Sequence, residues 1–474
     1  MSLKTFGRQS LIYGFGHILA RLVTFLLLPL YTNIFSTEEY GVISLAYAFI
    51  GFANILFHYG MDTALMKFYI TENEKEKIDV FSTVWILQLC TSFIFAFFMV
   101  WLSPFISKII LGESATLYIL KFIAIILALD VLWKIPMLLL RAEERSTQFV
   151  LFNLFNVLAT IAFNYYFVVK IDLGITGVFI GNILASIMMI FFLAPFIFKR
   201  VNLKKLSPKL LKKIMKFGLP FVPAGIFTMI MELADRYLLE WMVGTSSVGL
   251  YSAGYKLGMF GLLLVMGFNM AWTPFFLKKG NDNDAPILFS KISTYFLGIY
   301  GLVAIILSLY IGEIVRFDFG TYSLIGEAFW SSTKIVPVIF LAYFFFGLYV
   351  LQLPAVYIPE KTKWVPAFRA LGALTNVSLN ILIIPHYGVL GAAWATVFAQ
   401  ASMALFIFMK TRNSYKIPFR IISILTPLVF IFGAINISEK IFIIKAGYII
   451  MYVLIWYFVV VNKNERKSIT QLFS

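Results

Sequence analysis

The sequence predicts an all-α integral membrane protein, and three observations support this class. Of the 474 residues, 61% are hydrophobic and only 13% are charged, whereas soluble domains carry about 25% charged residues. The apolar residues form long runs, each close to the roughly 20 residues that an α-helix needs to cross a bilayer. The basic residues lie mainly in short segments between these runs. We therefore expect a bundle of membrane-spanning helices.

About fourteen apolar runs are long enough to be transmembrane helices. The first run continues well beyond the length of a signal peptide and ends without a small-residue cleavage site, so we expect a permanent span there. The expected spans begin near Gln9, Gly41, Val80, Leu117, Gln148, Ile175, Phe217, Val248, Pro286, Ser332, Trp364, Gly388, Ile417 and Lys440.

The distribution of Lys and Arg predicts the orientation of the chain. With a cytoplasmic N-terminus, roughly 27 of the 39 basic residues lie inside, about seven lie outside and about five lie within spans. Cytoplasmic loops of membrane proteins carry an excess of Lys and Arg. The asymmetry therefore favours an even number of spans with both termini in the cytoplasm. The net charge of +16 is explained by orientation, and we expect no nucleic-acid partner.

The two halves of the chain resemble each other at an offset of about 210 residues, which indicates a duplicated unit. The segments EYGVISLAYAF and SVGLYSAGYKL align Gly41 with Gly249. Six spans per copy is an even number, so both copies enter the membrane in the same direction and are related by a pseudo-two-fold axis along its normal. We expect one six-helix bundle over 1–200, a second over 201–412, and two additional helices with a cytoplasmic tail over 413–474.

The basic segment FKRVNLKKLSPKLLKKIMKFG joins the two copies and is expected to act as a hinge. Two bundles of this kind enclose a central cleft in many secondary transporters, which alternate access by rocking one bundle against the other. The sequence therefore favours transport across or within the membrane.

Four segments carry a family resemblance. They are PLYTNIFSTEEYGVISL after the first span, FGLPFVP at the seventh, DRYLLEWMVGTSSVGLYSAGYKL across the seventh and eighth, and AWTPFF in the eighth. Together they resemble Wzx-type polysaccharide flippases of the multidrug, oligosaccharidyl-lipid and polysaccharide (MOP) exporter superfamily. The resemblance extends from about Phe6 to the end of the twelfth span, most of the chain.

The resemblance implies a MATE-like fold and a flippase of the bacterial cytoplasmic membrane. Its substrate would be an undecaprenyl-pyrophosphate-linked oligosaccharide, moved from the inner to the outer leaflet by alternating access for O-antigen, capsule or exopolysaccharide synthesis. The implied partners are this lipid-linked oligosaccharide, the membrane, and the polymerase and chain-length machinery. Coupling to H+ or Na+, the membrane potential and mass action all stay open as driving forces.

Two alternatives compete with the flippase hypothesis. A MATE-like drug or organic-cation antiporter requires an anionic cleft, whereas the deep charges expected here are cationic. A membrane glycan polymerase requires a large extracytoplasmic loop, whereas the longest expected outer loop, from Gly312 to about Ser331, is modest. The sequence contains no phosphate-cradling GxxxxGK[ST] loop and no His, Cys or carboxylate cluster with metal-ligand spacing. We therefore predict a transporter without catalytic residues, metal or cofactor.

Cationic residues within the spans are the candidate substrate ligands. A charge at the centre of a span costs roughly 2.5 to 3.5 kcal/mol on insertion scales, so such groups face water or a partner. Arg21 and Arg236 lie in the first spans of the two copies, and arginine binds phosphate oxygens in a bidentate manner. The expected central cationic cavity consists of Arg21, Arg236, Lys256, Arg369 and His17. For His17, a neutral histidine bonded to a neighbouring span is the alternative, and Lys256 and Arg369 can instead extend to an interface.

Acidic and basic residues at close spacing are candidates for gating contacts or ion pairs. Glu232 and Arg236 are four residues apart, which places opposite charges on one helical face, with Asp235 beside them. This group is either a self-neutralised structural cluster or an arginine that exchanges its carboxylate partners for substrate. Glu240, near the outer interface, is expected to be solvated.

Two further candidate contacts lie in the first copy. Asp62, one helical turn after His58, is expected to make a structural or gating contact near the cytoplasmic mouth. Asp130 and Lys134 share the four-residue spacing, but Lys134 is close to an inner loop and is expected to extend towards the interface. Polar and aromatic residues that either contact sugar or pack helices are Asn153, Asn156, Asn164, Asn376, Asn380, Tyr47, Tyr255 and Trp272.

Overall fold

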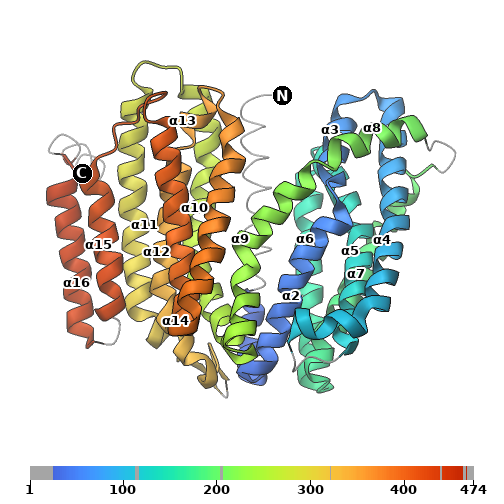
Figure 1. Cartoon of the computed structure of the whole chain (residues 1–474), viewed down its shortest axis with the longest axis horizontal. Coiled ribbons are helices and arrows are strands. Elements are labelled where there is room, and N and C mark those ends of the chain that lie inside the picture. The colour runs from blue at the N-terminus through green and yellow to red at the C-terminus, as the bar shows by residue number, and fades with distance from the viewer. Residues whose placement is uncertain are drawn as a thin grey trace. The chain divides into compact units, whose positions relative to one another are not determined.

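The protein is a helical membrane protein in the part of the chain that its structure, a computed structural model, describes. This part comprises residues 25–112, 117–202, 207–320, 322–437, 440–462 and 466. Nearly all of it is α-helical (Figure 1), and a single two-stranded hairpin is present among these residues. The expected all-α class is therefore confirmed. The start of the first expected span, near Gln9, lies outside the described residues.

The chain forms two compact units, an N-terminal unit of residues 1–31 and 35–249 and a C-terminal unit of residues 32–34 and 250–474. The elements of the N-terminal unit are α2 (Thr37–His58), α3 (Met61–Thr71), α4 (Glu74–Leu111), α5 (Leu117–Ala142), α6 (Ser146–Asn164), η1 (Tyr165–Lys170), α7 (Gly174–Phe198), α8 (Pro208–Gly218) and α9 (Phe221–Met242). Helix α10 (Thr245–Lys279) begins in this unit and continues into the next.

The elements of the C-terminal unit complete the chain. They are α11 (Ala285–Val315), β1 (Asp318–Phe319), β2 (Tyr322–Ser323), η3 (Glu327–Ile335), α12 (Val336–Leu351), α13 (Pro354–Tyr357), η4 (Thr362–Trp364), α14 (Val365–Thr411), α15 (Ile421–Ile437), α16 (Phe442–Ile455) and η5 (Trp456–Val460). The two units are the parts of the chain that make most of their contacts internally, and they divide after Gly249. The boundaries expected at residues 200 and 412 follow the sequence repeat and stay a prediction.

The number of spans agrees with the expectation. Among the described residues, eleven segments are long and apolar enough to cross a membrane. One of them, α14, contains two helices, because Gly388 adopts φ 52° and ψ −126° and interrupts it. Two shorter apolar helices, Phe25–Ile34 and α15, complete fourteen apolar segments in the described part of the chain. The helix starts also agree within a few residues, as at Leu117 and Gly174.

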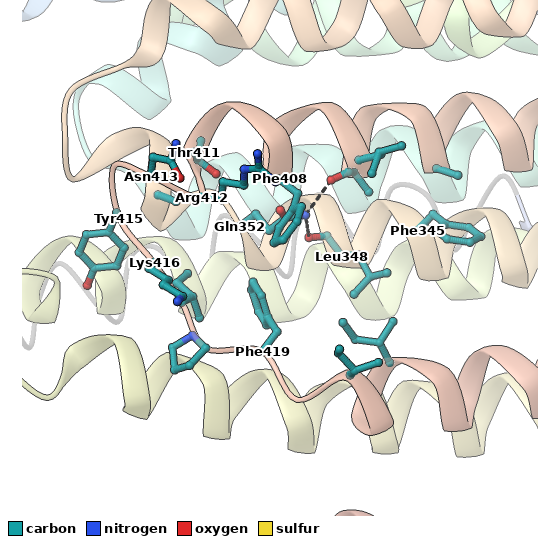
Figure 2. Close-up of a pocket in the computed structure, with 18 residues that line it drawn as sticks. Phe345, Leu348, Gln352, Phe408, Thr411, Arg412, Asn413, Tyr415, Lys416 and Phe419 are labelled. Carbon is teal, nitrogen blue, oxygen red and sulfur yellow. Dashed lines mark hydrogen bonds between the residues drawn. The ribbon is translucent and has the colours of Figure 1, made fainter.

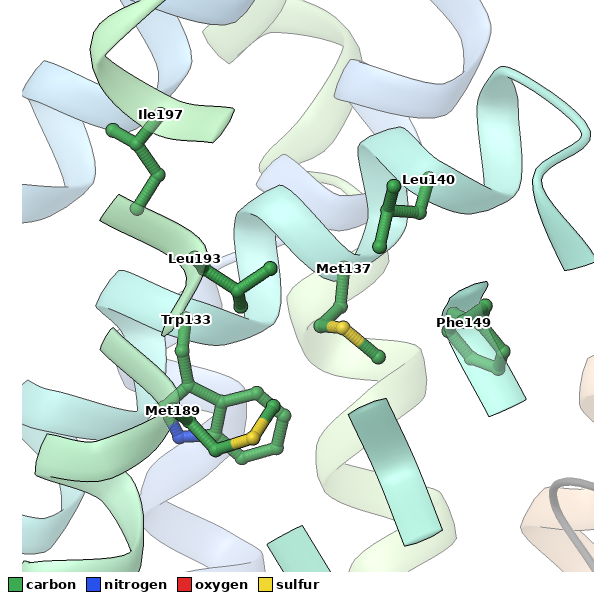
Figure 3. Close-up of a cluster of buried hydrophobic side chains, with 7 residues drawn as sticks. All are labelled: Trp133, Met137, Leu140, Phe149, Met189, Leu193 and Ile197. Carbon is green, nitrogen blue, oxygen red and sulfur yellow. The ribbon is translucent and has the colours of Figure 1, made fainter. Parts of the chain in front are cut away.

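A cluster of apolar side chains holds the N-terminal unit together at one end. Residues on α7 that are four apart face residues of α5 and α6, because this spacing places them on one side of a helix. The buried members, shown in Figure 3, are Trp133, Met137, Leu140, Phe149, Met189, Leu193 and Ile197. Helix α7 therefore packs between α5 and α6 at this end of the unit.

The C-terminal unit is built around α12. Its sequence is apolar on every side, which is typical of a helix surrounded by other helices, and thirteen of its sixteen residues are buried. Helices α11, α14 and α15 pack against it. Helix α16 packs on α11 and α15, and the buried ammonium of Lys445 donates to the Glu313 carboxylate of α11. The two C-terminal helices are therefore attached to the unit by both apolar and ionic contacts.

Equivalent residues of the two sequence copies contact each other where α2 and α10 begin. A Cβ atom on Gly41 would overlap the carbonyl oxygen of Thr245, and a Cβ atom on Gly249 would overlap that of Thr37. Thr37 and Thr245 each precede their own glycine by four residues, so the two contacts are reciprocal. The hydroxyls of Thr37 and Ser246 are also 2.7 Å apart. Such reciprocity is what a pseudo-two-fold relation requires.

This contact makes Gly249 intolerant of a side chain. We expect Gly249→Ala to lower the free energy of unfolding by about 1–3 kcal/mol, because the added carbon meets a backbone atom and forces the helices apart. Gly267→Ala on the same helix is the control, since no atom lies within 4 Å of its Cβ position, and should be neutral or stabilising by up to ~1 kcal/mol. Thermal unfolding of the purified chain in detergent measures both. Equal changes in unfolding free energy for Gly249→Ala and Gly267→Ala would contradict the close contact at Gly249.

Candidate functional site

Arg236 forms a buried ion pair on α9, the first span of the second copy. Its Nη1 donates to Asp235 Oδ1 at 3.0 Å and to the carbonyl oxygen of Glu232 at 2.9 Å. The side chains of Arg236 and Asp235 are only 11% and 2% exposed. Of the two carboxylates expected beside Arg236, Asp235 is the one that forms the ion pair. Glu232 contributes its backbone carbonyl, because the adjacent carboxylate of Asp235 is the buried one and gains more from neutralisation.

Glu240 also differs from its expected environment. It is half-buried, and its Oε1 accepts a hydrogen bond from Thr245 Oγ1 at 3.0 Å. The expectation of a merely solvated carboxylate is wrong, because the start of α10 folds back over the end of α9. The four ionisable groups of α9 are thus divided between a buried pair, an exposed carboxylate and a carboxylate bonded to the following helix.

The other expected cavity cations lie in different parts of the chain. Lys256 is half-buried on α10. The guanidinium carbon of Arg369 on α14 lies 5.8 Å from the ring centre of Tyr349 and 5.9 Å from that of Phe346, both on α12. An aromatic face stabilises a cation at such distances. Arg21 and His17 lie outside the described residues. The expected convergence of these cations stays a prediction.

Asp130 on α5 is the centre of a polar contact inside the N-terminal unit. Its Oδ2 accepts from Lys134 Nζ at 2.7 Å, and its Oδ1 accepts from Trp133 Nε1 at 3.0 Å and from Ser186 Oγ of α7 at 2.7 Å. Lys134 is therefore ion-paired, as the four-residue spacing allowed, rather than extended towards the interface. The physical reason is that Asp130 is only 13% exposed, and a buried carboxylate requires a cation and hydrogen-bond donors.

Asp62 contacts His58 across a turn. Helix α2 ends at His58 because Tyr59 and Gly60 adopt left-handed conformations, with φ of 30° and 78°, so Asp62 lies in the first turn of α3. The two side chains are 2.7 Å apart between Nδ1 and Oδ1, and Gln88 Nε2 of α4 donates to the His58 carbonyl at 2.9 Å. The expected contact is present as a link between three helices, and its gating role stays a prediction.

A cluster around Glu143, in the turn between α5 and α6, was not expected from the sequence. The Glu143 carboxylate accepts from Arg200 Nε and Nη2 at 3.1 Å each and from the Tyr69 hydroxyl at 2.8 Å, and it forms an ion pair with Arg145 Nε at 3.0 Å. Burial, with the bond to Glu143, raises the pKa of the Tyr69 phenol, so Tyr69 remains a donor. The adjacent charges in "RAEER" could have indicated an ion pair with Arg145. Nothing in the sequence indicated Arg200, which is 57 residues away.

Several expected sugar contacts are hydrogen-bonded between helices. This favours the helix-packing interpretation for Asn164, Tyr47, Tyr255 and Trp272. The bonds are Tyr31 to Asn164 at 2.6 Å, Asn182 to Tyr47 at 2.6 Å, Tyr343 to Tyr255 at 2.9 Å, and Trp272 to the Val350 carbonyl at 3.3 Å.

A cavity of about 730 Å³ lies in the C-terminal unit, between the ends of α12 and α14 and the start of α15. Apolar side chains such as Phe345, Leu348 and Phe408 line its length, and Arg412 and Lys416 lie at its loop end (Figure 2). This volume is within the range of small-molecule sites, which is about 300–1,000 Å³. An apolar wall with cations at one end suits an amphiphile that carries an anionic head.

Polar groups around this cavity are held in place by hydrogen bonds. Gln352 Nε2 donates to the carbonyl oxygens of Leu348 and Ala404 at 2.9 and 3.0 Å (Figure 2). The Tyr415 hydroxyl donates to the Gly280 carbonyl at 2.9 Å, and burial raises the pKa of the Tyr415 phenol. The loop that carries Lys416 is thereby attached to the end of α10. In the sequence, this region is visible only as a basic loop between two apolar runs. Such a loop does not by itself indicate a cavity.

Comparison with known proteins gives the class of the chain. Residues 6–279 match the family described as polysaccharide biosynthesis protein, and the chain belongs to this family. A Haloferax volcanii protein named as a flippase, AglR, is 28% identical over 173 residues, a match that spans only 35% of either chain. A Shigella flexneri protein named as an O-antigen transporter is 21% identical over 425 residues, which cover 85% of this chain and 97% of that protein.

A solved structure confirms the fold. The lipid II flippase MurJ, in an inward closed conformation, superposes with a TM-score of 0.74 at 17% identity, over 94% of this chain and 98% of that one. The chain is therefore a multi-pass membrane protein of the polysaccharide biosynthesis family with the fold of a lipid flippase. Its relatives are named as transporters rather than as enzymes.

Proposed function

We propose that this chain is a flippase that moves an undecaprenyl-pyrophosphate-linked oligosaccharide from the inner to the outer leaflet of a cytoplasmic membrane, with both termini in the cytoplasm. Family membership and the likeness to an O-antigen transporter support a polysaccharide precursor as cargo. The observation that carries the lipid-linked part of the proposal is the amphiphilic cavity of the C-terminal unit.

The cavity matches the chemistry of an isoprenoid pyrophosphate. Its apolar length between α12, α14 and α15 removes a segment of the hydrocarbon chain from contact with other lipids, and Arg412 and Lys416 supply charge-assisted hydrogen bonds to phosphate oxygens. Under the proposed orientation, the ends of α12 and α14 face the cytoplasm. This is the side from which a precursor made in the cytoplasm enters.

The cavity provides the first test of the proposed function. We expect Arg412→Gln/Lys416→Gln to raise the Kd for the lipid-linked oligosaccharide by about tenfold or more, because each charge-assisted bond contributes ~1.5–3 kcal/mol. Ala401→Trp fills the cavity and should reduce flipping similarly. Phe398→Trp, at an exposed position of α14, is the matched control and should flip normally. Flipping is measured in reconstituted vesicles, and normal rates in both cavity variants would contradict the proposal.

Arg236, in the N-terminal unit, is proposed as a contact to the pyrophosphate at a step separate from its binding in the C-terminal cavity. Its buried pair with Asp235 keeps the guanidinium neutralised in the absence of substrate, and an incoming pyrophosphate offers more oxygens in bidentate geometry than one carboxylate does. The Glu232 carboxylate is exposed one helical turn earlier. It can interact with Arg236 once the pair with Asp235 is broken. The participation of Arg21, His17, Lys256 and Arg369 stays a prediction.

A double mutant separates binding from structure at Arg236. Arg236→Gln alone leaves a buried carboxylate without its cation and should cost about 3–5 kcal/mol of stability, whereas Asp235→Asn/Arg236→Gln should restore most of it. Flipping should stay at least about tenfold reduced in the double mutant, because the phosphate ligand is still missing. Asp130→Asn/Lys134→Gln, which removes a second ion pair of the N-terminal unit, should retain flipping. Normal flipping by Asp235→Asn/Arg236→Gln would show that the pair is only structural.

Alternating access is proposed to separate the starts of α2 and α10. The hydroxyls of Thr37 and Ser246 are 2.7 Å apart there, so the two side chains meet and cysteines at these positions can approach each other. In a Cys90→Ser background, Thr37→Cys/Ser246→Cys should lose most flipping on oxidation and recover it on reduction. The single Thr37→Cys variant with oxidant is the control. Full flipping by the oxidised double variant would exclude movement at this end.

A further inference from the structure

Helix α8 is a short amphipathic helix that connects the two sequence copies. It begins at Pro208, directly after Ser207, whose hydroxyl accepts a hydrogen bond from the Leu210 amide. At about 100° per residue, its four lysines occupy one arc of the helix and its apolar residues occupy the rest. The lysines are Lys209, Lys212, Lys213 and Lys216, and α8 contains no acidic residue.

One apolar face of α8 is used for packing within the N-terminal unit. Ile214 and Gly218 are buried, and a Cβ atom on Gly218 would lie 2.9 Å from the Gly60 carbonyl oxygen. The Phe217 ring lies 5.6 Å from that of Phe68 on α3. Figure 1 shows α8 beside α3 and at a steep angle to the long helix α4. These contacts hold α8 in one position on the unit.

A second apolar face of α8 is left open. Leu211 and Met215, four residues apart, line a hollow of about 410 Å³ with Pro208, and Lys212 and Lys216 lie at its rim. The span α9 begins only two residues after α8 ends. The open face and the lysine arc therefore lie side by side next to the start of a membrane span, an arrangement typical of helices at a membrane surface.

The lysines differ in what they contact. Lys213 Nζ is 2.7 Å from Glu72 Oε1 and lies over the Phe68 ring, and its hydrogen bond lowers the pKa of the Glu72 carboxyl. Lys209, Lys212 and Lys216 are exposed, and within the described part of the chain none of the three forms an ion pair. An open cationic row thus remains beside the apolar stripe.

We propose that α8 binds the anionic phospholipids of the leaflet in which it lies. Leu211 and Met215 contact acyl chains, while Lys212 and Lys216, with Lys209, bind lipid phosphates. An acidic soluble protein needs the cations but not the adjacent apolar stripe, so a bilayer surface fits the two features together. Anionic lipid then holds the segment between the two copies at the membrane surface, an interaction that does not depend on the identity of the transported substrate.

The test uses the full chain with Cys90→Ser and Leu219→Cys, labelled with an environment-sensitive dye one residue after α8. It is reconstituted in vesicles of phosphatidylcholine and phosphatidylglycerol, with one lipid brominated at a time so that it quenches the dye on contact. Brominated phosphatidylglycerol should quench more strongly than brominated phosphatidylcholine at equal mole fraction. Lys212→Gln/Lys216→Gln should reduce this preference by about fivefold for each lysine removed.

Three comparisons decide the outcome. Lys212→Arg/Lys216→Arg should keep the preference for phosphatidylglycerol, as should Lys278→Gln/Lys363→Gln, which removes the same charge elsewhere. Leu211→Ser/Met215→Ser should reduce quenching by both lipids. Equal quenching by the two lipids in the parent chain, or quenching by aqueous iodide in place of either lipid, would overturn the proposal. No transport step enters the measurement, so its failure is distinguishable from a failure of the proposed function.

Discussion

Close approach of two backbone segments at Gly41 and Gly249 is the constraint on which the arrangement of the charged helices depends. Gly41 lies against the carbonyl of Thr245, and Gly249 lies against the carbonyl of Thr37. Within a bilayer, helices associate through close packing because lipid tails are as apolar as their side chains. Two positions without a Cβ atom permit this approach. This contact brings the starts of α2 and α10 together. Helix α9, which carries Arg236, packs along α2.

Two buried carboxylates inside helices of the N-terminal unit are neutralised by residues that lie close in the chain. Asp130 obtains its cation from Lys134, and Asp235 obtains its cation from Arg236. Such pairing limits the cost of burying a charge, so depth alone does not identify a substrate ligand. The cavity near Arg412 and the open face of α8 are different in kind. There, cations lie beside apolar surface at helix ends, an arrangement suited to amphiphiles.

Prediction from the sequence succeeded for features that local composition controls. The start of α5 at Leu117 and the break at Gly388 follow from runs of apolar residues and from a glycine between them. It left the choice open where several partners were available. Spacing allowed Arg236 to meet either Glu232 or Asp235, and the structure pairs it with Asp235 because that carboxylate is buried. The bond between Glu143 and Arg200 joins residues 57 apart in the chain, and no local pattern indicates it.

The sequence alone determined that the chain is a membrane protein with about fourteen spans and an internal repeat, because hydropathy is summed over roughly 20 neighbouring residues and repeats are visible in one dimension. Only the tertiary structure decided the reciprocal glycine contact, the partner of each buried charge and the position of the amphiphilic cavity. These depend on distances through space between residues far apart in the chain, and on which polar groups become inaccessible to water when the helices pack.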